Sequence, residues 1–320
     1  MKQTKYLFLD IASSIFLLIL FISNFMGLLF ILDGNVGLSL LASTFITICY
    51  FFTVILLKKN KEMMIKKKLI HFSTFFWLFF IALFVISSYL MSHFINIQYN
   101  CKDKIQKDAL SKIQAVRDLK DSFVNRSSND LLNYDVLLKT KLNSYVNNPN
   151  LALKRNLIDS FHLDSTIFNT SFISPSAIVS GKLKIYEIID SNAIKNIDST
   201  IVLNCDNYQA IFDNWKILKL VNAYNSLNDF YLNSLTYVNK KLSALPLDTS
   251  SIENQLLTNP LPLNNPSKLN KLYPSNSLVP NLFVLFMNLF ILIPFIFEKV
   301  RKYNASVPNT NGHKGKGIEY

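Results

Sequence analysis

Residues 11–32, IASSIFLLILFISNFMGLLFIL, run for 22 residues without a charged side chain. At a rise of about 1.5 Å per residue, a helix of about 20 residues crosses the roughly 30 Å hydrocarbon layer of a bilayer. Three further runs are similarly long and apolar, namely 38–57, 69–92 and 278–297. Four such runs in one chain predict four transmembrane helices rather than the core of a soluble protein.

The first run could instead be the core of a cleaved signal peptide, because Lys2 and Lys5 precede it. Its length exceeds the about 7 to 15 residues that are usual for such a core, and no small-x-small cleavage site follows. We therefore expect residues 11–32 to be a membrane span.

Positive charge is concentrated beside the apolar runs. The net charge is +12, and most of the excess lies in residues 1–10, in the loop 58–68 and in the tail 298–320. The positive-inside rule predicts that both termini are cytoplasmic and that residues 93–277 lie on the outer side. The loop is expected to contact anionic lipid headgroups through six lysines, Lys58, Lys59, Lys61, Lys66, Lys67 and Lys68.

The outer segment begins with a predicted helical domain, 93–245. Apolar residues recur every three or four positions over 105–145, with a polar interruption at 125–130, so we expect one long helix with a weak point or two in sequence. A second helix of about 40 residues is expected from Asp206 to Leu245. We expect the two apolar stripes to pack as a coiled-coil-like stalk with Trp215 and Leu218 between them; alternatively, one or both stripes bind other subunits.

Residues 151–203 predict a small α+β cap, with a short helix around Leu157 and alternating strands at 182–188 and 199–203. Residues 246–277 are rich in proline and asparagine and indicate an extended linker back to the membrane. The tail 298–320 is expected to be disordered. The predicted fold is therefore a mainly α membrane protein with four transmembrane helices and an extracytoplasmic helical domain that carries this cap.

Few ionisable residues lie inside the apolar runs. Asp10 and His71 fall at their cytoplasmic edges, where each can reach water. Three asparagines within the apolar runs are expected to form hydrogen bonds between helices rather than to bind a substrate. They are Asn24, Asn281 and Asn288. Pro294 is expected to bend the fourth helix.

The outer domain offers little for catalysis. Its single glycine, Gly181, cannot build a phosphate-binding loop, and the four histidines are scattered without metal-ligand spacing. His162 near Asp164 is expected to be a surface residue. The basic residues flank apolar helices rather than interleaving with aromatic residues, so nucleic-acid binding is not expected. We predict neither catalytic residues nor a cofactor or metal site.

Two cysteines, Cys101 and Cys205, are both assigned to the outer side, near the starts of the two predicted long helices. They could form one disulfide in an oxidising compartment, or they could remain free thiols. The third, Cys49, falls inside the second apolar run.

The order of the four runs around an outer domain is similar to the tetraspanin layout, but the Cys-Cys-Gly signature and paired cysteines of that family are missing. It also resembles the TssN-type multi-pass membrane subunits of one subtype of bacterial type VI secretion system. That resemblance implies a structural role in an envelope-spanning complex. Only the order of 11–32, 38–57, 69–92 and 278–297 carries it.

We therefore expect a non-enzymatic subunit in a bacterial inner membrane, with its large domain in the periplasm, that anchors or scaffolds an envelope assembly such as a secretion system. Its partners would be membrane lipids, other protein subunits and further copies of the chain. The alternative is a receptor whose outer domain binds a ligand and signals through a separate cytoplasmic protein, because the cytoplasmic parts are too short for an output domain.

Overall fold

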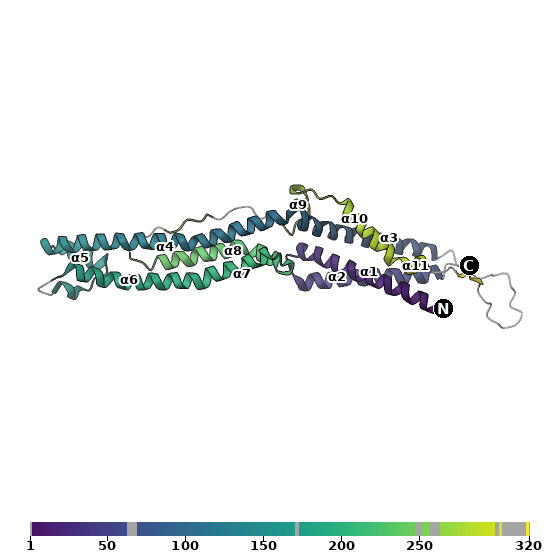
Figure 1. The fold of residues 1–320 in the computed structure, drawn as a ribbon, viewed down its shortest axis with the longest axis horizontal. Coiled ribbons are helices and arrows are strands. Elements are labelled where there is room, and N and C mark those ends of the chain that lie inside the picture. Colours follow the sequence, from purple (N-terminus) through teal and green to yellow (C-terminus); the bar gives the residue numbers. More distant parts are fainter. Residues whose placement is uncertain are drawn as a thin grey trace. The chain divides into compact units, whose positions relative to one another are not determined.

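The computed structural model describes residues 2–62, 69–169, 173–246, 251–255, 263–297, 301–302 and 318–319. This part of the chain is mainly helical (Figure 1). It also holds two strands of two residues, β1 (Arg301–Lys302) and β2 (Ile318–Glu319), which pair antiparallel within the tail expected to be disordered. The tail residues 303–317 lie outside the described residues. The chain divides into two compact units.

The first unit comprises residues 1–105, 217–222 and 260–320. Three of its helices are long and apolar enough to cross a membrane, in agreement with the first three predicted spans. They are α1 (Lys2–Ile31), α2 (Val36–Glu62) and α3 (Leu69–Ile95). A short π-helical turn, η1 (Asn96–Cys101), follows α3 directly.

The fourth predicted span is interrupted. Helix α10 (Leu278–Ile291) packs against α1 and α3, and α11 (Ile293–Ile296) packs against α1 and α2. Pro294 stands in the first turn of α11, where its missing N–H and fixed φ are tolerated, so the expected bend is a full break at Leu292. The hydroxyl of Ser13 donates to the carbonyl oxygen of Ile291 at 2.9 Å and so satisfies a backbone group at this break. Neither helix alone has the length of a span.

The apolar helices of this unit pack through large side chains and a few buried polar groups. Asn24 on α1 donates to the Ser87 hydroxyl on α3 at 3.1 Å, so its predicted interhelical bond is confirmed. The Tyr50 hydroxyl on α2 lies 3.3 Å from the same Ser87 oxygen. Asn288 is buried and donates to the Val284 carbonyl oxygen within its own helix, and it also hydrogen-bonds the Tyr50 hydroxyl on α2, so its predicted interhelical bond is confirmed. Asn281 is exposed.

A close approach between α1 and α3 requires glycine at position 27. A Cβ atom added there would lie 2.5 Å from the backbone oxygen of Leu90, well inside van der Waals contact. Small residues allow helix backbones to approach each other closely, and this is a common device between helices in membranes.

The predicted extended linker is partly helical. Helix α9 (Pro266–Leu272) begins where the Asn265 side chain accepts the backbone N–H of Lys268 and Pro266 supplies the first helical residue. The segment is held against the end of α3, because Asn96 donates to Asn270 at 2.7 Å. Cap and proline chemistry therefore outweighed the extended preference of a proline-rich segment.

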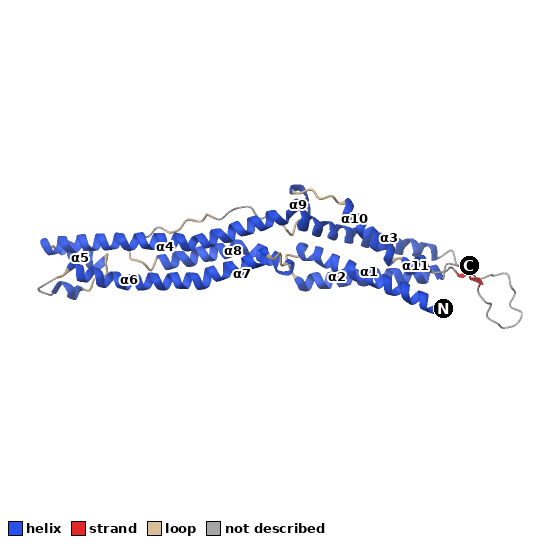
Figure 2. Ribbon diagram, in the orientation of Figure 1, coloured by secondary structure: helices blue, strands red, loops and turns tan. Residues whose placement is uncertain are grey.

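The second unit comprises residues 106–216 and 223–259. Helix α4 (Lys102–Asn147) belongs to this unit from residue 106 onward and forms one side of a helical bundle. Figure 2 shows the helices in blue. The other helices are α5 (Leu151–Asp159), η2 (Ser165–Asn169), α6 (Pro175–Ile197), η3 (Asp198–Val202), α7 (Leu203–Asp213) and α8 (Ile217–Leu242), of which residues 217–222 belong to the first unit.

The long apolar stripe over 105–145 forms one uninterrupted helix, α4, so the alternative of two helices in sequence is wrong. Cys205 on α7 lies 3.9 Å from the carbonyl oxygen of Ile113, and Gln106 donates to the carbonyl oxygen of Phe212 at 2.7 Å. These pairs show that α7 runs antiparallel to α4. The two predicted stripes therefore pack on each other, as expected.

The predicted strands of the cap are wrong. Residues 182–188 lie inside α6 and 199–203 fall in η3 and the start of α7, and the described residues between 151 and 203 contain helices and turns only. Ser174 and Pro175 favour a helix start. The residues of α6 that face the bundle recur at intervals of four and three, while two isoleucines between them are exposed and create an alternating pattern; the inward-facing set is Val179, Leu183, Tyr186, Asp190, Ala193 and Ile197.

The predicted helix from Asp206 to Leu245 is also broken, into α7 and α8. Trp215 adopts a left-handed backbone conformation with φ 46°, and the N–H of Lys216 bonds the carbonyl of Ile211 at 2.9 Å, which ends α7. The break shifts the helical phase, so Leu218 is 52 % exposed and Trp215 is only half-buried. The expected central position of these two residues is therefore wrong.

Candidate functional site

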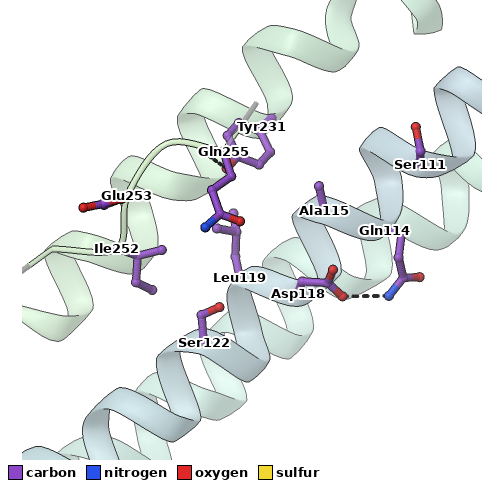
Figure 3. A pocket seen from close by; sticks show the side chains of 10 residues that line it. All are labelled: Ser111, Gln114, Ala115, Asp118, Leu119, Ser122, Tyr231, Ile252, Glu253 and Gln255. Atoms are coloured by element: carbon purple, nitrogen blue, oxygen red, sulfur yellow. Dashed lines mark hydrogen bonds between the residues drawn. The ribbon is translucent and has the colours of Figure 1, made fainter. Parts of the chain in front are cut away.

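A polar groove of about 360 Å³ lies in the second unit between α4, α8 and the segment 251–255 (Figure 3). Helix α4 contributes a stripe with spacings of three and four residues, so that these side chains share one helical face. The full lining is Ser111, Gln114, Ala115, Asp118, Leu119, Ser122, Tyr231, Ile252, Glu253 and Gln255.

The segment 251–255 forms one wall and is fixed to α8 by side chains. Asn239 accepts the backbone N–H of Ile252 at 2.9 Å and donates to its carbonyl oxygen at 3.3 Å. The backbone N–H of Gln255 donates to the Tyr231 hydroxyl at 3.0 Å. Two α8 residues therefore satisfy backbone groups that a neighbouring strand would otherwise satisfy.

The groove presents hydroxyl, amide and carboxylate groups beside apolar surface from Ala115, Leu119 and Ile252. The amide of Gln114 donates to Asp118 at 2.8 Å, which orients that carboxylate. Figure 3 shows the Gln255 side chain reaching from the segment toward Leu119, with the Ser122 hydroxyl also at the groove. This set can exchange hydrogen bonds with a polar ligand. The lining holds two serines and two carboxylates but no histidine, the residue that most often activates a serine as a nucleophile.

A buried ion pair lies next to the groove. Lys112 is 2 % exposed, and its ammonium lies 3.3 Å from Asp108 Oδ2 and 5.4 Å from the centre of the Tyr224 ring. The Tyr224 hydroxyl donates to the same carboxylate oxygen at 2.7 Å. A charge this deeply buried is retained only with a close partner. The cluster therefore links α4 to α8 and fixes their positions along each other's axes.

A second buried carboxylate, Asp130, lies further along α4. It is 3 % exposed, and its nearest described cation is Arg126, one helical turn away at 3.6 Å. Burial raises the pKa of this carboxyl above its ordinary value, and Arg126 opposes the rise. Neutral Asp130 is thus favoured more in the folded chain than in the unfolded one.

The structure holds Cys101 and Cys205 as free thiols. Burial raises the pKa of each thiol to about 11. Both are therefore protonated near neutral pH and are poor nucleophiles and metal ligands. The disulfide considered from the sequence is absent from the structure.

Three of the predicted lipid-facing lysines lie at the end of α2, and Lys66, Lys67 and Lys68 lie outside the described residues. Lys61 donates to the carbonyl oxygens of Phe295 and Ile296 at 2.9 and 3.0 Å. Its charge thereby caps the C-terminal end of α11, where backbone carbonyls lack helical partners. Lys58 forms an ion pair with Asp10 at 3.6 Å, and Lys59 is exposed.

Sequence reasoning missed the polar groove. Ser111, Gln114, Asp118 and Ser122 follow a helical period, but a solvated helix face has the same pattern. This face becomes part of a cavity only because α8 and the segment 251–255 pack beside it. No pattern in the local sequence predicts that packing.

Among the described residues, no group of three or more His, Cys, Asp and Glu is placed to hold a metal ion. The fold and the site together define a helical protein with apolar helices able to cross a membrane and a second helical unit that carries a polar groove. Comparisons with protein-family models, with curated proteins and with solved structures find no match to this chain.

Proposed function

We propose that this protein is a non-enzymatic subunit of a bacterial inner membrane that anchors or scaffolds a multiprotein envelope assembly. In this proposal four spans leave both termini in the cytoplasm and the second unit in the periplasm. The resemblance to TssN-type subunits suggests a secretion system as the setting.

The observation that carries the proposal is a pair of apolar surfaces on the second unit. Leu132 and Val136, one turn apart on α4, are 64 % and 61 % exposed, although the neighbouring face of the same helix is fully buried. Ile185 and Ile188 on α6 are 53 % and 55 % exposed. Exposed apolar surface of this kind often marks a site of protein interaction.

The two surfaces lie at the same level of the bundle. Tyr134 of α4 packs edge-on against Tyr186 of α6, with ring centres 5.2 Å apart. Val136 and Ile185 are near neighbours of these two tyrosines along their helices. Val136 lies two residues from Tyr134 and Ile188 two residues from Tyr186, so these side chains point about 160° away from the facing tyrosines. The two surfaces therefore face away from each other, and each would bind its own partner or copy.

The packing of the fourth apolar segment supports a fourth crossing. Helices α10 and α11 together extend from Leu278 to Ile296 and contact all three longer apolar helices. Ser13 and Lys61 satisfy backbone carbonyls at and after the break, as a broken helix in a bilayer requires.

Photo-crosslinking tests the scaffold proposal. A photoreactive residue at Val136 or Ile188 in the full-length protein in cells should form defined crosslinks to another envelope protein or to a second copy of the chain. The same residue at Asn143, an exposed polar position of α4, is the matched control. Crosslinking at Val136 no stronger than at Asn143 would argue against these surfaces as interfaces.

The polar groove favours a second candidate function, a receptor that signals through a separate cytoplasmic protein. A polar ligand in the groove would contact α4, α8 and the segment 251–255 together. Binding would then be expected to protect the amides of Ile252 and Gln255 from hydrogen exchange. Screening polar solutes against the wild type and a Ser122→Trp variant, which fills the groove, would test this candidate.

A further inference from the structure

A crevice of about 310 Å³ lies in the first unit, where the start of α1 meets the end of α2 and Pro294 of α11. Its polar end carries one acidic and one basic side chain, Asp10 and Lys58. The carboxylate and ammonium are 3.6 Å apart, and the side chains are 55 % and 27 % exposed. An ion pair this exposed contributes little to stability, so charged groups of a ligand can compete for both partners.

The polar end lies where a bilayer would meet water. Asp10 is two residues inside the apolar helix segment that begins at Phe8, and Lys58 is three residues before Lys61, where the second segment ends. Both charges are therefore at the level of lipid headgroups if these helices cross the membrane.

Next to the ion pair the crevice is lined by Ser13 and Ser14, whose hydroxyls donate to backbone carbonyl oxygens, and its remaining lining is apolar and extends to the level of acyl chains. Leu17 lies seven residues beyond Asp10 on α1, which corresponds to a depth of about 10 Å. Phe51, Val54 and Ile55 line the same crevice from α2. The crevice thus offers paired opposite charges at one end and hydrocarbon contacts at the other.

We propose that this crevice binds a zwitterionic phospholipid whose headgroup ends in a primary ammonium, as in phosphatidylethanolamine. The ammonium donates hydrogen bonds to the Asp10 carboxylate, the phosphate accepts from the Lys58 ammonium, and an acyl chain lies along Leu17 and Val54. An anionic headgroup without an amine would meet the negative charge of Asp10. A trimethylammonium headgroup has no N–H to donate, so phosphatidylcholine satisfies Asp10 less well.

Native mass spectrometry of the full-length protein, released from detergent that contains equal amounts of phosphatidylethanolamine, phosphatidylglycerol and phosphatidylcholine, tests this inference. We expect phosphatidylethanolamine to be retained preferentially. Asp10→Asn and Lys58→Gln should each lower its retention about fivefold, the equivalent of roughly 1 kcal/mol at 1.4 kcal/mol per tenfold. Asp10→Glu keeps the carboxylate and should preserve the preference.

Lys59→Gln is the matched control, because Lys59 is an exposed neighbour that does not line the crevice. It should leave retention of phosphatidylethanolamine unchanged. Circular dichroism melting checks that each variant is folded, and two independent variants keep the test valid if one is not. Equal retention of the three lipids, a preference for phosphatidylglycerol, or an equal loss in Lys59→Gln would each overturn the proposal.

Discussion

Replacing Asp108 with alanine should loosen the contact between α4 and α8. The carboxylate of Asp108 is the partner of the Lys112 ammonium at 3.3 Å and of the Tyr224 hydroxyl at 2.7 Å. Removing one partner of a buried ion pair costs about 3 to 5 kcal/mol, because the remaining charge stays buried. Asp108 itself is 19 % exposed, so water can partly replace it and we expect about 3 kcal/mol, at the lower end of that range.

Hydrogen exchange of α4 and α8 amides in the full-length protein in mild detergent measures this change. A loss of about 3 kcal/mol corresponds to exchange that is roughly 150-fold faster at amides that exchange by opening of this contact. Asp121→Ala, an exposed position on the same helix, should change exchange by less than about 0.5 kcal/mol.

A second substitution separates a buried-charge effect from simple loss of packing. Lys112→Met in the Asp108→Ala background removes the orphaned ammonium and keeps an apolar side chain of similar length, so it should recover most of the lost protection. Exchange in Asp108→Ala within about twofold of the wild type would refute the reasoning. A double variant no more protected than the single one would refute it as well.

The structure gives three further predictions. Gly27→Ala should lower the melting temperature in detergent and cost about 1 to 3 kcal/mol, because the new Cβ would lie 2.5 Å from the Leu90 oxygen. Since burial raises the folded-state pKa of Asp130, its contribution to stability is fully present below the ordinary value of about 3.9 and is lost as pH rises through the raised value. Asp130→Asn should remove this loss, seen as a flatter dependence of unfolding on pH. Buried Cys205, with its pKa raised to about 11, should react with maleimide at pH 7.5 only after denaturation.

Helical periodicity predicted the elements that depend on one stripe of apolar residues. The stripe that includes Ile105 and Phe123 became α4 because its buried face is continuous over the whole helix. The first three apolar runs became α1, α2 and α3 for the same kind of reason, since length and composition suffice to recognise them.

The predictions were wrong where exposed apolar residues of a helix imitated the alternation of a strand, and where a helix ended without a glycine or proline. Ile185 and Ile188 are exposed residues of α6, and their spacing together with inward-facing Leu183 imitated a strand. Trp215 adopts positive φ, an uncommon conformation for a bulky residue, so nothing in the sequence marked the end of α7.

The candidate sites depend on contacts between distant parts of the chain. The groove needs Tyr231 and the segment 251–255 to approach a polar face of α4, and the lipid crevice needs Asp10 and Lys58 to meet across two helices. The types of these residues were visible in the sequence, but their proximity follows from tertiary packing.

Cysteine labelling from outside the cell membrane tests the central claim, a membrane protein whose second unit lies outside the cytoplasm. In a chain with Cys49, Cys101 and Cys205 replaced by serine, a membrane-impermeant maleimide should modify Asn143→Cys on exposed α4 in intact spheroplasts. It should modify Lys59→Cys only after the membrane is permeabilised. Labelling of Lys59→Cys from outside, or protection of Asn143→Cys until permeabilisation, would contradict the account.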